Sequence, residues 1–483
     1  MTLLPQKVIQ MKPTKTSRQH HLSAITIAAS LWCVLTTLIL ASTVGLYTWK
    51  GATGLGVIIQ KGPLSNLSVT LYSVAVVWFM AGILLFLLHF QRINSANAVT
   101  LAGFLIICLL YSNILRERPE YGDIQYYVRA ATSLYRGEPL PAEYVYPPLW
   151  AALLEPLVPL GGKTIFSSVW LLNLISLFAF YFILVRILQH YGFSPRLSAL
   201  VTTVFMAINA PLLRTLVYMQ VNLHVMNLVL LSLLLYRRAP FFSALALSIA
   251  VHLKISPIVL VLAFLLEKNW RWLGCFALNM LLVGALPLVL YGPSPYLDFL
   301  RNASSLAGVH GLSFRENSFD SFFTAAGKLI HLAPFWIYAG AYMGKAILIV
   351  ATFFVAAHAI RQKTFYNGEP GTYLYNAVAP LTILMTLASP IVWEHHGVFL
   401  ALAFLLLLKR LETSGEWLLF GFAYFLEYLL PTFDYFPWSY GRLLAPLICL
   451  GLMWRISKRQ GVSGLFESMN NWLIGLSPSR VSR

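Results

Sequence analysis

Charged residues are scarce in this sequence. Asp, Glu, Lys and Arg make up only 11% of its 483 residues, whereas 58% are hydrophobic. With a mean hydropathy of +0.72, this composition excludes a soluble globular protein and predicts an all-α, polytopic membrane protein. Long polar stretches are also lacking. The longest segment without a predicted membrane span is the loop from Arg116 to Thr164, so we expect one integral-membrane domain over residues 1–483.

Cysteine is rare, and its spacing fits no metal or redox motif. The four cysteines lie far apart in apolar segments, and we interpret them as small core residues. A Gly-rich phosphate-binding loop is absent as well, which argues against a nucleotide substrate. The net charge of +17 comes from Lys and Arg in short loops between apolar segments, a pattern typical of membrane topology rather than of nucleic-acid binding.

Apolar runs suitable for membrane helices follow one another along the whole chain. They lie at about 24–47, 70–90, 98–115, 165–187, 196–213, 217–236, 240–253, 255–266, 272–291, 335–360, 373–388, 391–408, 415–431 and 441–455. Two of them, 240–253 and 255–266, are shorter than the ~20 residues of a full span and could be half-helices that meet at Lys254. The sequence therefore predicts about 12–14 transmembrane helices.

The basic residues set the orientation. If the N-terminus is cytoplasmic, most Lys and Arg residues, among them Arg237, Arg238, Lys409 and Arg410, fall in inner loops, as the positive-inside rule requires. We expect a multi-pass protein of the bacterial inner membrane. On this topology the remaining polar positions reach the outer, periplasmic face, where we place the chemistry. They are Asp123, Gln220, Lys254, Arg315, His395, His396 and Asp434.

The segment from Asp123 to Gly137 is an amphipathic helix with signals at both ends. Such a helix lies in the membrane interface rather than across it. Gly137 stands at the C-cap and Asp123 at the N-cap, so Asp123 could be a helix cap and nothing more. A helix N-terminus should also lower the pKa of this carboxylate. The apolar face is predicted to comprise Ile124, Tyr127, Val128, Ala131, Leu134 and Tyr135, with Gln125, Arg129, Ser133 and Arg136 opposite.

Lys254 stands between two short apolar segments, with Pro257 breaking the helix three residues later. A lysine within a membrane is costly and by default indicates a functional site, here for a phosphate. The alternative is a side chain that extends to the membrane interface.

His395 and His396 follow Trp393 at the outer start of an apolar run. They could hydrogen-bond near a phosphate or merely serve the helix entry. Adjacent residues on a helix point about 100° apart, so both are not expected to address one ligand. For the same reason Glu394 and the two histidines cannot converge on one ion, and we expect no metal.

Other polar and aromatic residues suit a sugar or a lipid. Gln220 and Asn222 open a span and could bind sugar hydroxyls, or could serve polar packing between helices. Tyr127, Tyr146 and Trp393 could stack on a sugar or line a lipid groove, although interfacial aromatics need no such function.

Four of these stretches occur together in a known family. An Asp after a transmembrane segment, an aromatic-rich helix, a Gly and the ending Tyr144-Val-Tyr-Pro-Pro-Leu149 resemble the first outer loop of polyprenyl-phosphate-dependent GT-C glycosyltransferases. The chain looks most like glycosyltransferase family 87, the α-mannosyltransferase-like group. The further matching stretches are Gln220-Val-Asn222, Lys254-Ile-Ser-Pro257 and Ser389-Pro-Ile-Val-Trp-Glu-His-His396, in the family's order.

The resemblance implies a GT-C fold and a hexosyltransferase activity without a cofactor. The donor would be a polyprenyl-phosphate-linked sugar, most often mannose, and the acceptor a lipid-linked or cell-envelope glycan. Asp123 would act as general base in an inverting, metal-independent displacement, for which one carboxylate suffices. Lys254, His395 and Arg315 would bind the phosphate. The catalytic core would cover 98–408, preceded by two additional spans in 1–97 and followed by spans and a tail in 409–483.

A transporter or flippase of lipid-linked intermediates is the alternative function. Such a protein should show paired half-sequences and ionisable residues near mid-span. In this sequence no repeat is evident and the polar clusters gather at one predicted face, so the sequence favours the enzyme.

Overall fold

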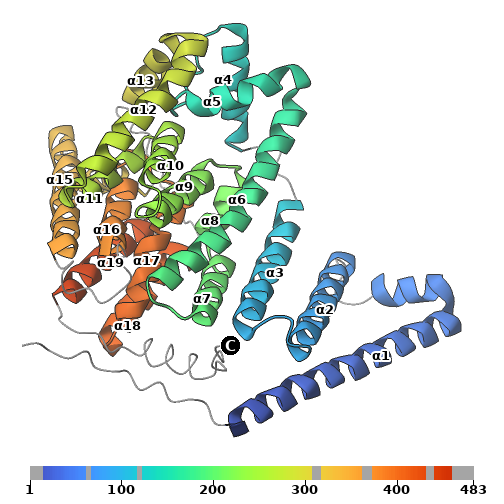
Figure 1. Ribbon diagram of the computed structural model, residues 1–483. Helices are drawn as coiled ribbons and strands as arrows, with labels where there is room; N and C mark the ends of the chain where they lie inside the picture. The colour runs from blue at the N-terminus through green and yellow to red at the C-terminus, as the bar shows by residue number, and fades with distance from the viewer. Residues whose placement is uncertain are drawn as a thin grey trace, which may run out of the picture. The chain divides into compact units, whose positions relative to one another are not determined.

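The computed structural model describes residues 15–60, 67–116, 122–306, 317–361, 373–430 and 440–458, and within these ranges the chain is helical without a β-strand (Figure 1). The predicted class, an all-α polytopic membrane protein, is confirmed. Arg315 and Asp434 lie outside the described residues.

Among the described residues, four helices are long and apolar enough to cross a membrane, and seven further apolar helices have only 10–17 residues. The four are Ile25–Trp49 within α1 (Lys15–Gln60), α6 (Gly162–His190), α12 (Trp270–Tyr291) and α15 (Pro334–Arg361). Many of the predicted spans are thus broken into shorter helices. The predicted span 196–213, for example, is two helices, α7 (Pro195–Ala207) and α8 (Ala210–Val217), bent by 63°. The bend follows from Asn209, whose side chain caps α8 by accepting the Leu212 N–H at 2.8 Å.

The predicted break at Lys254 is confirmed. Helix α10 (Pro240–Leu253) ends there, and Lys254 has an extended backbone with φ −156° and ψ 125°. The chain then continues as η2 (Ser256–Leu260) and α11 (Val261–Leu266), with Pro257 in the first turn of η2. Because proline lacks an N–H and restricts the residue before it, the helix cannot run through this point.

The chain divides into two compact units. One comprises residues 1–113, 194–203 and 469–483. Within it, α1 packs against α2 (Leu67–His89) through two tryptophans: Trp32 donates from its indole N–H to the Trp78 carbonyl at 3.0 Å, and the two rings stack. The unit thus includes the residues of the two predicted N-terminal spans, 24–47 and 70–90, of which the first contains a helix long enough to cross a membrane and the second an apolar helix of 15 residues.

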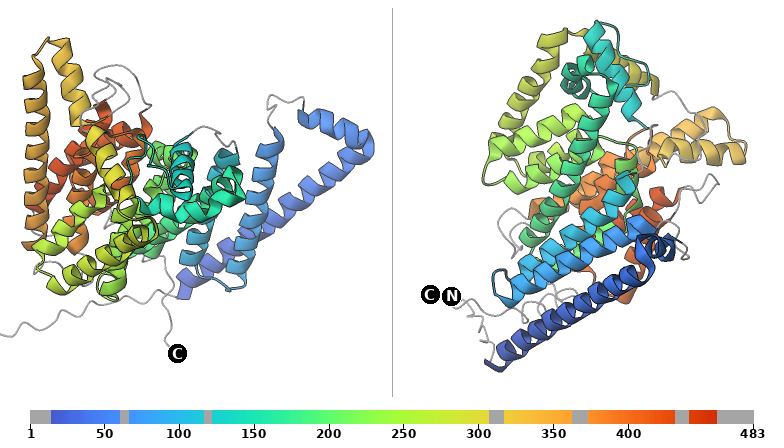
Figure 2. Two further views of the ribbon diagram at one scale, coloured as in Figure 1. Left: turned by 90° about the horizontal axis from the view of Figure 1, so that it is seen from above. Right: turned by 90° about the vertical axis from the view of Figure 1, so that its right-hand side faces the viewer.

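The other unit comprises residues 114–193 and 204–468 and contains every candidate site residue. In it, α10 packs between α9 (Asn222–Leu235) and α12, and α15 lies along α16 (Tyr373–Leu387). Figure 2 shows α14 (Phe319–Leu329) beside the start of α15, with which it is in contact. Helices α16 and α17 (Ala401–Leu407) are buried along their whole length and form the centre of this unit.

Helix α4 (Ile124–Arg136) begins and ends where the sequence predicts. Gly137 adopts the left-handed conformation, with φ 67°, and its N–H bonds to the Leu134 carbonyl at 3.1 Å. The buried face is rotated from the predicted one: Ser133 is buried, whereas Tyr135 is 52% exposed. The rotation arises because α4 is covered by α5 (Leu149–Leu154), η1 (Glu155–Leu160) and α6, which determine the buried stripe.

The loop after α4 is held by α13 (Ser294–Leu306), which lies at the same end of the unit (Figure 1). Asp298 accepts the Leu140 N–H at 3.0 Å. The buried Asn302 amide donates to the carbonyls of Pro141, at 2.8 Å, and Tyr144, at 3.1 Å. This loop therefore has a fixed path toward Tyr146.

Asn222 stands at the start of α9, and polar residues predicted to face the cytoplasm gather near the opposite end of this helix. Arg237 donates to the Tyr373 hydroxyl at 3.3 Å, and Tyr373 in turn contacts Glu267. Lys409 donates to the Tyr191 carbonyl at 2.8 Å. At a rise of 1.5 Å per residue, the two ends of α9 are about 20 Å apart.

Candidate functional site

Two tyrosines of the predicted outer loop converge on Gln220. Tyr127 donates from its hydroxyl to the Gln220 side-chain oxygen at 3.1 Å, and Tyr146 does so at 3.2 Å. Gln220 and Tyr127 are completely buried. The Gln220 amide nitrogen has no partner among the described residues, so it remains as a hydrogen-bond donor at the site.

Lys254 points toward this group rather than away from it. Its ammonium donates to Asn222 Oδ1 at 2.9 Å and lies 2.7 Å from His396 Nε2. It also lies over the rings of Tyr146 and Phe399, at 5.8 and 5.4 Å from their centroids, where cation–π attraction stabilises it. Helix α10, which packs against α9, ends at Lys254. The extended backbone of Lys254 at this point directs its side chain toward Asn222 at the start of α9.

His396 is offered two donors. The Trp393 N–H points at its Nδ1 from 2.8 Å, while the Lys254 ammonium is at Nε2. Nδ1 also lies 3.2 Å from the Trp393 carbonyl, so it accepts from the Trp393 N–H in one tautomer and donates to that carbonyl in the other. In the second tautomer Nε2 is the acceptor nitrogen that faces the Lys254 ammonium.

His395 has a different set of contacts. Its carbonyl accepts from Thr215 Oγ1 at 3.1 Å and from Asn222 Nδ2 at 3.4 Å, and its ring faces Tyr218. The centroids of the two histidine rings lie 4.6 Å apart, but the two residues have different hydrogen-bond partners. It is His396, rather than His395, that contacts Lys254. Asn222 uses both ends of its amide to join Lys254 to His395.

Asp123 occupies the N-cap position of α4 but does not cap the helix. Its backbone is helical, with φ −63° and ψ −14°, and its side chain makes no capping hydrogen bond. Burial raises the pKa of the Asp123 carboxyl to about 6, although the positive charge of Lys254 acts in the opposite direction. The expectation of a lowered pKa is therefore wrong, because the carboxylate does not bind the helix N-terminus and is partly desolvated.

Gly122 explains how the chain brings Asp123 to this place. A Cβ on Gly122 would lie 3.2 Å from the carbonyl oxygen of Tyr218, so a larger residue would push the loop away from the end of α8. The carboxylate of Asp123 acts electrostatically on Lys254, Tyr127 and Tyr146, which places it in the same cluster.

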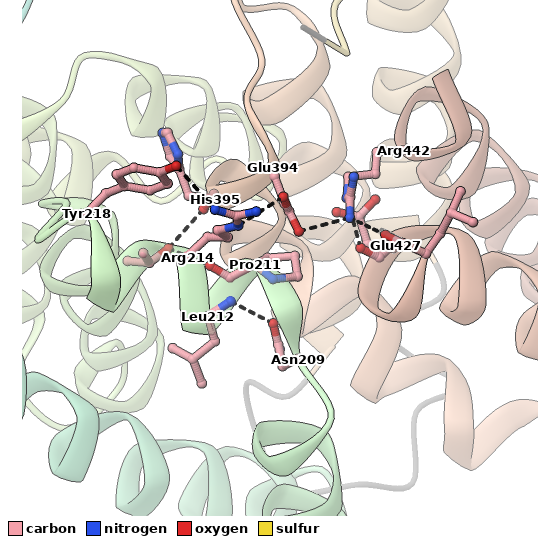
Figure 3. Close-up of polar contacts among 11 residues, drawn as sticks. Asn209, Pro211, Leu212, Arg214, Tyr218, Glu394, His395, Glu427 and Arg442 are labelled. Carbon is pink, nitrogen blue, oxygen red and sulfur yellow. Dashed lines mark hydrogen bonds and ion pairs between the residues drawn. The ribbon is translucent and has the colours of Figure 1, made fainter. Parts of the chain in front are cut away.

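Sequence reasoning missed two arginines next to the cluster. Glu394 pairs with Arg442 of α19 (Gly441–Ser457) at 3.0 Å and with Arg214 of α8 at 3.4 Å (Figure 3). Glu394 is thus directed at arginines rather than at the histidines beside it. Arg442 could have been noticed in the sequence because it lies inside the apolar run 441–455, and a charged residue within a membrane segment indicates a functional role. Nothing in the sequence distinguishes Arg214 from other basic residues near helix ends.

The structure brings together nearly all the predicted site residues at one end of the second unit. They are Asp123, Tyr127, Tyr146, Gln220, Asn222, Lys254, His395 and His396, with Trp393 bonded to His396. Arg315 lies outside the described residues. The carboxylate of Asp123 and the buried side chain of Lys254 thus lie in one cluster of this polytopic helical protein.

The comparisons with known proteins identify the family. A family model described as Glycosyltransferase family 87 matches residues 144–390, just over half of the chain. The chain belongs to this family and is a membrane glycosyltransferase. No curated protein and no solved structure matches it. The matched range includes Tyr146, Gln220, Asn222 and Lys254, whereas Asp123 precedes it and the two histidines follow it.

Proposed function

We propose that this protein transfers a sugar, most often mannose in related enzymes, from a polyprenyl-phosphate donor to a lipid-linked or cell-envelope glycan. The reaction would take place at the periplasmic face of a bacterial inner membrane. The observation that supports it best is that Asp123, whose side chain does not cap its helix, acts electrostatically on Lys254, which donates to Asn222 and lies 2.7 Å from His396.

The chemistry needs little beyond these two groups. The acceptor hydroxyl attacks the anomeric carbon as the bond from that carbon to the phosphate oxygen breaks, so the anomeric centre inverts. Asp123 accepts the hydroxyl proton, and Lys254 stabilises the negative charge that develops on the phosphate. His395, His396 and Arg315 would complete the phosphate site.

The sugar would lie against the tyrosines and Gln220. The unpartnered Gln220 amide nitrogen is placed to donate to a sugar hydroxyl, and Tyr146, which is only partly buried, offers a ring surface. Asn222, whose amide is engaged at both ends, suits a positioning role better than direct contact with the sugar.

The rate of transfer should depend on pH through Asp123. Below about pH 6 the carboxyl is protonated and cannot accept a proton; above it the carboxylate is ionised and active. We expect kcat/KM to rise about tenfold per pH unit as the pH increases to about 6. The donor is a phosphodiester, whose charge is constant in this range. The Asp123→Asn protein should retain a low rate of transfer that no longer falls as the pH drops below about 6. If its rate still falls in this range, the titrating group is not Asp123.

The direct test is transfer by the purified protein from a panel of polyprenyl-phosphate sugars, with nucleotide sugars as the comparison. We expect transfer from at least one lipid-linked donor, with release of polyprenyl phosphate, and none from nucleotide sugars. Transfer from a nucleotide sugar alone would refute the proposed donor. Movement of an intact lipid-linked sugar across vesicles without transfer would favour the flippase.

A further inference from the structure

Glu394 holds two arginines that differ in how firmly they are fixed (Figure 3). The side chain of Arg442 is 5% exposed, and it also donates to the carbonyls of Glu427, at 3.2 Å, and Leu430, at 2.5 Å. The side chain of Arg214 is 45% exposed, and among the described residues it pairs at 3.4 Å with Glu394, donates at 3.2 Å to the Tyr218 hydroxyl and lies 5.7 Å from the centroid of the Tyr218 ring. If Arg214 leaves Glu394, Arg442 still pairs with that carboxylate, so the largely buried Glu394 keeps one cationic partner.

Arg214 stands beside the predicted phosphate position. Helix α8 packs against η4 (Glu394–Leu400), and Thr215, the next residue, bonds to the His395 carbonyl. Arg214 and Lys254 both act electrostatically on the His395 ring. The cluster thus has a second cation, and this one is accessible and has a replaceable partner.

The proposed reaction creates a charge that Lys254 alone does not balance. The donor phosphodiester carries one negative charge. When the bond from the anomeric carbon breaks, its electron pair stays on the phosphate oxygen, and the acceptor proton goes to Asp123. The released monoester carries a charge of about −1.5 to −2 at neutral pH. Among the described residues of the proposed phosphate site, the single ammonium of Lys254 matches the charge of the donor but not that of the product.

We propose that Arg214 exchanges Glu394 for the phosphate as this second charge develops. A guanidinium binds two phosphate oxygens at once, which an ammonium cannot do. Arg214 then distinguishes the dianionic polyprenyl phosphate from the monoanionic donor, and it accelerates the departure of the leaving group. This inference rests on the proposed function, because it requires a lipid phosphate at Lys254.

Several other charged or titratable groups surround this position. They are Asp123 at α4, Tyr218 after α8, Lys254 after α10, Glu394, His395 and His396 on η4, Glu427 on η6 (Phe425–Leu429) and Arg442 on α19. A change of pH can therefore act on the protein as well as on the phosphate. The test needs a second ligand whose own charge stays constant.

The experiment measures the affinity of the full-length protein, in detergent, for farnesyl phosphate and for its methyl ester between about pH 5 and pH 8, which brackets the second phosphate pKa of about 6. Farnesyl phosphate gains a charge over this range and the ester does not. We expect wild-type affinity for farnesyl phosphate to rise at least about tenfold relative to the ester, as one charge-assisted hydrogen bond provides. Arg214→Gln should abolish this relative gain, and Arg214→Lys should retain part of it.

Arg455→Gln is the matched control. Arg455 is also an exposed arginine, 61% exposed, that pairs at 3.3 Å with a buried carboxylate, Glu416, but it lies near the opposite end of α19 from Arg442. The Arg455→Gln protein should show the full wild-type rise in affinity for farnesyl phosphate relative to the methyl ester. In turnover, Arg214→Gln should lower kcat and leave the donor KM unchanged. A gain that persists in Arg214→Gln would overturn the inference and leave the proposed function intact. Failure of the wild-type protein to bind either compound would overturn both.

Discussion

Replacing Asp123 with Asn should lower sugar transfer by at least about 10²-fold while the protein keeps its fold. Asparagine has nearly the same shape but cannot accept the proton of the acceptor hydroxyl. The structure adds that Asp123 makes no capping bond, so neither Asp123→Asn nor Asp123→Ala removes a hydrogen bond from the start of α4. Both variants should therefore unfold at the wild-type temperature, and both should be nearly inactive in an assay with the correct donor.

Glu412→Gln provides the control for this experiment. Glu412 is an exposed acidic residue that follows Lys409 and Arg410, which the sequence places in an inner loop. It should retain wild-type transfer. Unchanged turnover in a well-folded Asp123→Asn protein would show that Asp123 is not the base and would place the flippase hypothesis ahead.

Replacing Lys254 with Met should have the next largest effect, a fall in transfer of about 10²- to 10³-fold, the loss typical of removing one group that stabilises a developing charge. Methionine fills a similar volume without the charge. The substitution leaves the Asn222 Oδ1 acceptor without its donor, so the unfolding temperature of the variant is measured alongside its activity. Affinity for farnesyl phosphate should fall as well, because the ammonium that would hold the phosphate is gone.

Lys409→Met tests whether the effect is specific to the site. Lys409 is also a part-buried lysine that donates to a protein oxygen, the Tyr191 carbonyl. It belongs, however, to the group of polar residues at the opposite end of α9 from Asn222. Its transfer rate should stay close to wild type. If Lys254→Met retains full activity and full phosphate affinity, Lys254 has a structural role only.

Local patterns allowed much of this architecture to be predicted. The bounds of α4, the left-handed Gly137 and the break at Lys254 each follow from a few neighbouring residues: hydrophobic periodicity, a glycine cap and a proline. The convergence of Gln220, Lys254 and the histidines could also be expected, because each opens or interrupts an apolar segment at the same predicted face.

Features that depend on contacts between distant segments could not be predicted. The raised pKa of Asp123 arises from burial by other elements, and a position at a helix N-terminus suggested the opposite. The choice of His396 over His395 depends on how η4 packs against α8 and α9. Arg442 lies in the segment after residue 408 that the sequence placed outside the catalytic core, yet it pairs with Glu394 beside the histidines.

Asn302 has a bearing on how this protein can be produced. With Ala303 and Ser304 it forms the acceptor pattern for N-linked glycosylation. Its amide nitrogen, the atom to which a glycan would be attached, donates to the carbonyls of Pro141 and Tyr144. A eukaryotic expression host adds such glycans to luminal loops during synthesis. A glycan on Asn302 would prevent α13 from docking on the loop that leads to Tyr146. A bacterial host, or Ser304→Ala in a eukaryotic one, avoids this; the Ser304 hydroxyl bonds only within its own helix, to the Arg301 carbonyl.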